Sequence, residues 1–305
     1  MSEILLETKG LTKQYGHHKA VDHVNIHIEK GAIYGFIGRN GAGKTTCLRM
    51  ICGLAKPTEG DISMFGHHGR GLKEIRSRIG CLIEAPGLYG NMTAYENLKI
   101  KCKLFGIRKP GYIEEILDTV GLNDTGKKKT KHFSLGMKQR LGIGLALVGE
   151  PDLLVLDEPI NGLDPQGIVE VRDTIRNLSE RRNMTVLISS HILEELSKIA
   201  TNYGIIHNGA LIQELTGEEL MKRCSERIEI TLDHPEAAVP VLENMGFANY
   251  QVTDRQHIQV FERLGESDVL NMELTRAGVS VRGISITSEE LENYFLNLTG
   301  GAGHA

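Results

Sequence analysis

A glycine-rich segment with the sequence GRNGAGKT, at residues 38–45, constrains this chain more than any other part of its sequence. It matches the pattern G-x-x-x-x-G-K-[ST], in which bare glycines let successive backbone N–H groups turn inward around phosphate oxygens. The apolar segment before it and the helix-forming segment after it predict a strand, a loop and a helix whose positive end points at the phosphates. The segment therefore predicts a nucleoside triphosphate site in an α/β domain.

Two side chains at the end of this loop are expected to contact the triphosphate and its metal ion. Lys44 supplies a positive charge to the β- and γ-phosphates, and the Thr45 hydroxyl is suited to ligate Mg²⁺. The other residues that we expect to bind the triphosphate are Gly38, Arg39, Asn40, Gly41, Ala42, Gly43 and Thr46.

Two carboxylates follow a second apolar segment, LLVLDE at residues 153–158. A short apolar run of this kind is typical of a buried parallel strand. Asp157, at its end, is placed to hold Mg²⁺ through water, and Glu158 is placed to polarise an attacking water as a general base. Two acids after a strand are also compatible with solvated turn residues. With the phosphate loop in the same chain, nucleotide hydrolysis is the better interpretation.

The segment FSLGMKQR, at residues 133–140, looks like the start of a helix, because Ser134 is a good N-cap. Gly136, one turn in, is a poor choice for a helix that only needs to be stable. This segment and three others, INGLDP, ISSHILEE and LTKQYG, resemble motifs of the ATP-binding subunits of ABC transporters. The resemblance covers residues 1 to about 225.

The resemblance implies ATP as the nucleotide and a role for each motif. Tyr15 is at the position of an aromatic residue that stacks on adenine, Asp164 is in the D-loop, and His191 is at the position of the switch histidine. In the family, two nucleotide domains pair head to tail. Ser134 and Gly136 of one copy then meet the γ-phosphate held by the other, and the bare Gly136 allows a close backbone approach. We therefore expect a homodimer.

The sequence departs from the family pattern at two places. In the signature, whose consensus is L-S-G-G-Q, only Ser134 and Gly136 are retained. In addition, Glu84 is at a position where most members have a glutamine whose carbonyl contacts Mg²⁺. A carboxylate is a hard oxygen donor and suits the metal as well. Glutamate at this position resembles the subgroup that exports bacitracin or gives immunity to lantibiotics. A neutral variation in a transporter of other cargo is the alternative.

The expected fold is α/β, a P-loop ABC ATPase domain with a mixed sheet core, an antiparallel β subdomain and a helical subdomain. We place this domain at residues 1–222, with the helical subdomain at about 93–149, where TAYE is a capping box. Residues 223–305 change character and predict a small α+β domain of the split β-α-β kind, whose last helix begins at the capping box TSEE. Its role is open between regulation, dimer stabilisation and contact with a partner.

Composition restricts the partners. The net charge of −4 and a lysine cluster without interleaved aromatics predict no nucleic-acid binding. The five cysteines form no CxxC pair, the N-terminus does not resemble a signal peptide, and no apolar segment is long enough to span a bilayer. We expect a cytoplasmic protein, peripheral on the inner face of the membrane, with a separate permease subunit as its partner.

Two other classes remain as alternatives to a transporter subunit. Soluble ABC ATPases of the ribosome are tandem double cassettes, whereas this chain has one cassette. Members that act on DNA carry a long coiled-coil insertion, for which the segment between phosphate loop and signature has no room. A P-loop kinase or GTPase gives no explanation of the signature or of His191.

Overall fold

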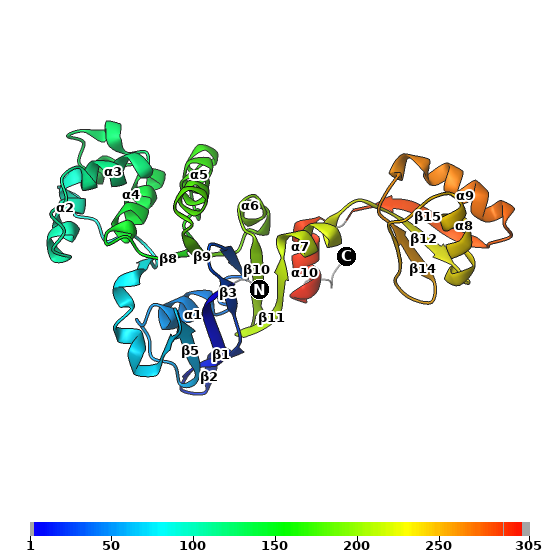
Figure 1. Ribbon diagram of the computed structural model, residues 1–305, viewed down its shortest axis with the longest axis horizontal. Coiled ribbons are helices and arrows are strands. Elements are labelled where there is room, and N and C mark those ends of the chain that lie inside the picture. The colour runs from blue at the N-terminus through cyan, green and yellow to red at the C-terminus, as the bar shows by residue number, and fades with distance from the viewer. Residues whose placement is uncertain (1–2, 289, 301–305) are drawn as a thin grey trace. The chain divides into compact units, whose positions relative to one another are not determined.

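The computed structural model describes residues 3–288 and 290–300, and the chain divides into two compact units, Met1–Gly217 and Glu218–Ala305 (Figure 1). Unit 1 contains two sheets and six α-helices among its described residues, and unit 2 contains a third sheet. Each unit is described by itself.

The first sheet of unit 1 is antiparallel, in the order β2-β1-β5-β6, with β3 also paired to β1. Its strands are β1 (Ile4–Tyr15), β2 (His18–Val24), β3 (His27–Glu29), β5 (Glu59–Met64) and β6 (His67–His68). The predicted antiparallel subdomain is confirmed. Residues 24–29, which alternate like one strand, are instead interrupted at Asn25. Its side-chain oxygen accepts from Gly10 N, and the Thr8 hydroxyl accepts from Ile26 N, so side chains replace strand pairing there.

The second sheet has six strands in the order β11-β10-β4-β9-β8-β7. Its strands are β4 (Ile33–Ile37), β7 (Ile79–Leu82), β8 (Leu153–Asp157), β9 (Thr185–Ser190), β10 (Asn202–His207) and β11 (Ala210–Thr216). All neighbours are parallel except β10 and β11, which makes the sheet mixed, as predicted. Every residue of β4, β8 and β9 is buried, because helices cover a parallel sheet on both faces.

The helices of unit 1 follow the glycine and capping signals of the sequence. They are α1 (Lys44–Ile51), α2 (Ala94–Leu104), α3 (Tyr112–Thr119), α4 (Leu135–Leu147), α5 (Pro165–Arg182) and α6 (Leu193–Ser197). Helices α2, α3 and α4 are grouped together as the helical subdomain (Figure 1). The predicted capping box forms at the start of α2, where Thr93 Oγ1 accepts from Glu96 N and Glu96 accepts from Thr93 N.

Unit 2 has an antiparallel sheet in the order β13-β14-β12-β15, built in the chain order β-α-β-β-α-β. Its elements are β12 (Arg227–Leu232), α8 (Val239–Asn244), β13 (Tyr250–Val252), β14 (His257–Val260), α9 (Ser267–Arg276) and β15 (Val281–Thr287). Apolar residues of β12 and β14 alternate toward a core shared with α8 and α9. This is the split β-α-β arrangement that the sequence predicts.

Two more helices belong to this end of the chain. Helix α7 (Gly217–Cys224) begins where the units divide, and α10 (Leu291–Leu298) contacts it through a hydrogen bond from Arg223 to the Tyr294 hydroxyl, 2.9 Å. The predicted start of the last helix at TSEE is wrong. Glu290 is the N-cap, with no side-chain capping bond, and residue 289 lies outside the described residues.

Within residues 3–288 and 290–300, no helix has the length and apolar character needed to cross a membrane.

Gly80, in β7, gives a direct test of how the helical subdomain joins the sheet. A Cβ at Gly80 would overlap the Ala146 carbonyl oxygen of α4, which is backbone and has little freedom to move. We expect Gly80→Ala to lower the free energy of unfolding by about 1–3 kcal/mol through overpacking. Urea unfolding monitored by circular dichroism measures this. Gly87→Ala is the control, because a Cβ there meets nothing within 4 Å. Equal stability of the two variants would contradict the packing described.

Candidate nucleotide site

The site lies at the edge where three neighbouring parallel strands of the second sheet end. Strand β4 runs into the phosphate loop, β8 ends at Asp157, and β9 ends at Ser190, just before His191. Ligands of open α/β sheets bind at the carboxyl ends of the strands. The strand order therefore brings together three segments that are far apart in the sequence.

The phosphate loop needs its glycines for conformation and for space. Gly41 and Gly43 have φ values of 82° and 107°, which favour glycine. A Cβ on Gly43 would also overlap the Ala20 carbonyl, and one on Gly38 would lie 2.6 Å from the Ile206 carbonyl oxygen. The other predicted residues of the loop differ in exposure. Arg39 and Asn40 are exposed, Ala42 is buried, and Thr46 is half-buried in α1.

Lys44 is the first residue of α1 and is almost fully buried, at 5% exposed. Its ammonium donates to the Gly38 carbonyl, 2.5 Å away, and lies 3.0 Å from Glu158 Oε1 in an ion pair without hydrogen-bond geometry. The structure therefore places the predicted phosphate-binding cation directly beside the predicted general base.

A chain of hydrogen bonds runs from Thr45 to Asp157 and then, through Ser189, to the backbone of Glu158. Thr45 Oγ1 donates to Asp157 Oδ2 at 2.8 Å, and the Ser189 hydroxyl donates to Asp157 Oδ1 at 2.6 Å. Ser189 Oγ in turn accepts from the backbone N–H of Glu158 at 3.0 Å. Asp157 and Ser189 are opposite each other in the register of β8 and β9, so the strand pairing itself sets this contact.

Glu158 has a left-handed backbone conformation, with φ of 48°, which turns the chain sharply after β8. Its Oε2 atom lies 2.8 Å from His191 Nδ1. Because an ionised carboxylate only accepts hydrogen bonds, Nδ1 of His191 carries the proton in this contact. Seven other described non-glycine residues also have a positive φ, so the contacts of Glu158, and not its backbone conformation alone, mark the site.

The chemistry of these oxygen donors suits Mg²⁺. The Thr45 hydroxyl and the Asp157 carboxylate are hard oxygen groups that lie 2.8 Å apart beside the loop. Glu84, the third predicted ligand, instead forms an ion pair with Arg49 of α1 and is 63% exposed. Within the described residues, no three His, Cys, Asp or Glu side chains gather as a metal cluster. The metal role of Glu84 therefore stays a prediction.

The signature residues and Asp164 lie at the starts of two packed helices. Ser134 caps α4 by accepting from Met137 N at 3.2 Å, and Asp164 caps α5 by accepting from Gly167 N at 3.1 Å. A Cβ on Gly136 would lie 3.4 Å from the Cα of Gly167, an ordinary contact. No hydrogen bond or ion pair of the described residues joins these three to the phosphate loop of the same chain.

Tyr15 ends β1 and is 52% exposed, with the Lys13 ammonium 5.1 Å from the centroid of its ring. A half-exposed ring of this kind has a face available for stacking.

Sequence reasoning missed Ser189, which holds Asp157 and Glu158 in place. A signal was present, because β9 has the sequence TVLISS and is buried throughout. A buried serine in an apolar strand needs a hydrogen-bond partner, and the carboxyl end of the strand points to the site.

Comparisons with known proteins agree with this geometry. The family model described as ABC transporter matches residues 21–161. The chain is 47% identical to the bacitracin transport ATP-binding protein BcrA of Bacillus licheniformis, over 97% of this chain and 98% of that protein. It is 43% identical to the lantibiotic transport ATP-binding protein SrtF of Streptococcus pyogenes, over 69% of this chain and 90% of that protein.

Solved structures give the same result. An ATP-binding cassette of an ABC transporter in its ADP conformation matches with a TM-score of 0.65 and 26% identity, over 73% of this chain and 95% of that one. A dimeric bacterial ABC transporter cassette matches with a TM-score of 0.63 and 25% identity, over 70% of this chain and 98% of that one.

The chain belongs to the ATP-binding proteins of the ABC transporter family, and the predicted fold is confirmed. It is a nucleotide-binding ATPase subunit, homologous over nearly its full length to ATP-binding proteins of bacitracin transport.

Ser189→Ala tests whether this serine positions the two acids. The change leaves Asp157 Oδ1 and the Glu158 N–H without their buried partner, so we expect a loss of about 1–3 kcal/mol in the free energy of unfolding. We also expect kcat for ATP hydrolysis to fall at least tenfold with little change in KM. Ser179→Ala, which loses one bond to the Gly31 carbonyl away from the site, is the control and should keep its kcat. A normal kcat for Ser189→Ala would contradict the positioning role.

Proposed function

We propose that this chain is the ATP-hydrolysing subunit of an exporter, in which two copies pair around ATP and drive a separate membrane permease. The observation that carries the proposal is the connection from Thr45 through Asp157 and Ser189 to Glu158 and His191 beside the phosphate loop. We assign residues 1–222 to the ATP-binding domain and residues 223–305 to a small α+β domain whose role is open. The protein works at the inner face of the membrane through its permease.

Binding of the triphosphate falls to the loop amides and Lys44, with the adenine on the exposed ring of Tyr15. Thr45 and Asp157 are the residues that hold Mg²⁺, which offsets phosphate charge when bound. Lys44 contacts Glu158 in the structure, and phosphate oxygens compete with that carboxylate for the ammonium. When Lys44 turns to the phosphates, Glu158 keeps its bond to His191 and is free to accept a proton from water.

The second half of each site comes from the partner copy. Ser134 and Gly136 lie at the N-terminus of α4, which carries partial positive charge and unpaired N–H groups. Asp164 caps the neighbouring α5 by accepting from Gly167 N, and Gly167 is also the residue that a Cβ on Gly136 would contact. In the proposed dimer, head-to-tail pairing directs these residues to the γ-phosphate of the other chain. Support for pairing comes from the dimeric bacterial cassette that this chain resembles.

The Glu158→Gln variant tests the general base. The amide keeps the size and polarity of the side chain but loses the basic oxygen, so we expect ATP binding to persist and kcat to fall by about 10²–10⁴. We also expect a stable dimer in ATP and Mg²⁺, detected by sedimentation velocity. Normal hydrolysis by this variant would mean that another group is the base.

Gly136→Ala tests the partner's approach to the phosphate. Within one chain the new methyl fits against Gly167, and alanine favours the helix, so the monomer should be at least as stable as the parent. We expect a loss of ATPase activity of tenfold or more, because the methyl meets the nucleotide of the other copy. Full activity at normal stability would contradict a phosphate contact at this position.

A peptide antibiotic such as bacitracin or a lantibiotic is the proposed cargo, and self-protection is the proposed outcome. Support comes from the relatives named for bacitracin and lantibiotic transport and from Glu84 in place of the common glutamine. A different cargo is the second candidate, because a relative named for daunorubicin resistance is 33% identical over 98% of this chain. A soluble ATPase acting on the ribosome or DNA is the remaining alternative.

Overproduction of the Glu158→Gln variant in the source cell separates these candidates. The variant should displace the normal subunit from its permease and block export. We expect a lower growth-inhibitory concentration for bacitracin or lantibiotics and no change for unrelated toxic compounds. An unchanged sensitivity with the variant bound to membranes would reject the cargo. Co-sedimentation with ribosomes in place of membranes would reject the transporter role.

A further inference from the structure

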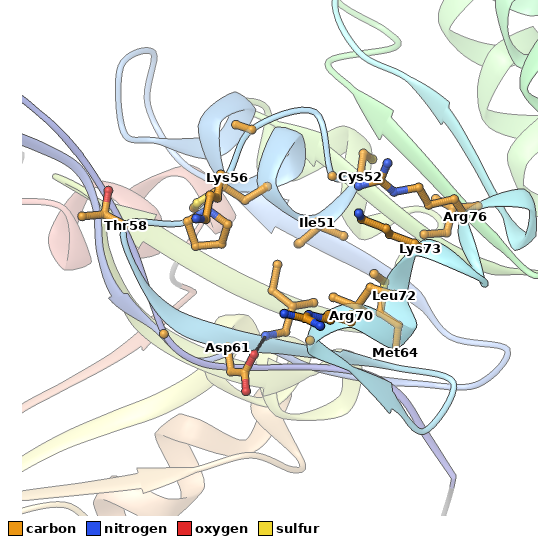
Figure 2. Close-up of a pocket in the computed structure, with 18 of the residues that line it drawn as sticks. Ile51, Cys52, Lys56, Thr58, Asp61, Met64, Arg70, Leu72, Lys73 and Arg76 are labelled. Carbon is orange, nitrogen blue, oxygen red and sulfur yellow. Dashed lines mark hydrogen bonds between the residues drawn. The ribbon is translucent and has the colours of Figure 1, made fainter.

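A hollow of about 790 Å³ lies at the C-terminal end of α1, away from the phosphate loop at its start (Figure 2). It is enclosed by the end of α1, by β5, and by the two short 3₁₀ helices at Gly69–Lys73 and Arg76–Arg78. Buried apolar side chains form its floor, among them Ile51, Ile62 and Met64. None of the phosphate-loop residues lines it, so this α1-end hollow is distinct from the nucleotide site.

Four cations surround this apolar floor. Arg70 and Lys73 are three residues apart in the first 3₁₀ helix, so their side chains lie on one edge of it, and Arg76 begins the second 3₁₀ helix. Lys56 adds a fourth positive charge from the segment after α1 (Figure 2). All four side chains are exposed, and none has a carboxylate partner among the described residues within ion-pair distance.

The hollow has fewer acidic residues than basic ones. Glu59 and Asp61, both from β5, also line it, and Asp61 Oδ1 accepts from the backbone N–H of Ile62 at 3.3 Å. Four cations against two carboxylates leave the hollow with positive charge. Arg76 is partly fixed, because its guanidinium lies against Gly53, where a Cβ would come within 3.0 Å of it. A concave site with one excess sign of charge concentrates ions of the other sign.

We propose that the α1-end hollow binds an amphiphile with a phosphate head group, whose apolar chain covers the floor. Its volume lies in the range of pockets for organic ligands, about 300–1,000 Å³, and exceeds what inorganic phosphate fills. A phosphate has three terminal oxygens and so engages several cations at once, and arginine matches its geometry. The apolar floor favours a ligand with a hydrocarbon part over a fully polar anion.

Monomeric dodecyl phosphate, below its micellar concentration, is the first probe. Isothermal titration of the full chain should show saturable binding at one site. Inorganic phosphate and neutral dodecyl maltoside should each bind at least tenfold more weakly, because each lacks one half of the interaction. We expect Arg70→Glu/Lys73→Glu to weaken dodecyl phosphate binding at least tenfold. Lys127→Glu/Arg181→Glu is the control, because it makes the same charge change at exposed positions outside the hollow.

Vesicles distinguish a free amphiphile from a lipid in a bilayer. The protein is mixed with vesicles of phosphatidic acid or of phosphatidylcholine. If it binds the phosphatidic acid vesicles alone, and the double variant loses this binding, the head group of a membrane lipid is the ligand. Unchanged binding in the double variant would overturn the proposal. The absence of binding to both dodecyl phosphate and phosphatidic acid vesicles would also overturn it. If, in that case, the double variant also fails to associate with its permease, the hollow is a permease contact and not an amphiphile site. Thermal unfolding confirms that both double variants are folded.

Discussion

The parallel pairing of β4, β9 and β8 is the constraint on which the rest of the site depends. Because neighbouring parallel strands end at one edge, the phosphate loop, His191 and the two acids meet there despite their distance in the sequence. The register then sets finer contacts, since Ser189 is opposite Asp157 and holds it by a 2.6 Å hydrogen bond. Buried apolar strands thus fix the position of polar groups that water would otherwise surround.

This edge supplies only part of what hydrolysis requires. In the proposed function, the loop, Lys44 and Glu158 bind phosphate and activate water, whereas the N-terminus of α4 with Ser134 forms its hydrogen bonds elsewhere in the chain. On this proposal, each chain carries a binding half and a signature half that serve different sites. The proposed division would make hydrolysis depend on pairing and would give a permease a means to couple its own movement to ATP.

Much of the fold was predictable because its signals are local. The phosphate loop, the capping box at Thr93 and the alternating strands of residues 223–305 each depend on neighbours in the sequence. Contacts between distant segments were not predictable in the same way. The Glu84 ion pair with Arg49 and the bond from Ser189 to Asp157 depend on how strands and helices pack. The last helix begins at Leu291 and not at TSEE, since a capping motif is only a weak local preference.

Mixing two inactive variants tests the shared site most directly. Lys44→Ala removes the phosphate-binding charge of one chain, and Gly136→Asp places a carboxylate in the signature of the other. Neither variant should hydrolyse ATP alone. In a mixed dimer, one site combines the intact loop of the second chain with the intact signature of the first, so ATPase activity should return on mixing. If the mixture stays inactive while both variants are folded and form mixed dimers, the two halves do not act across the chains.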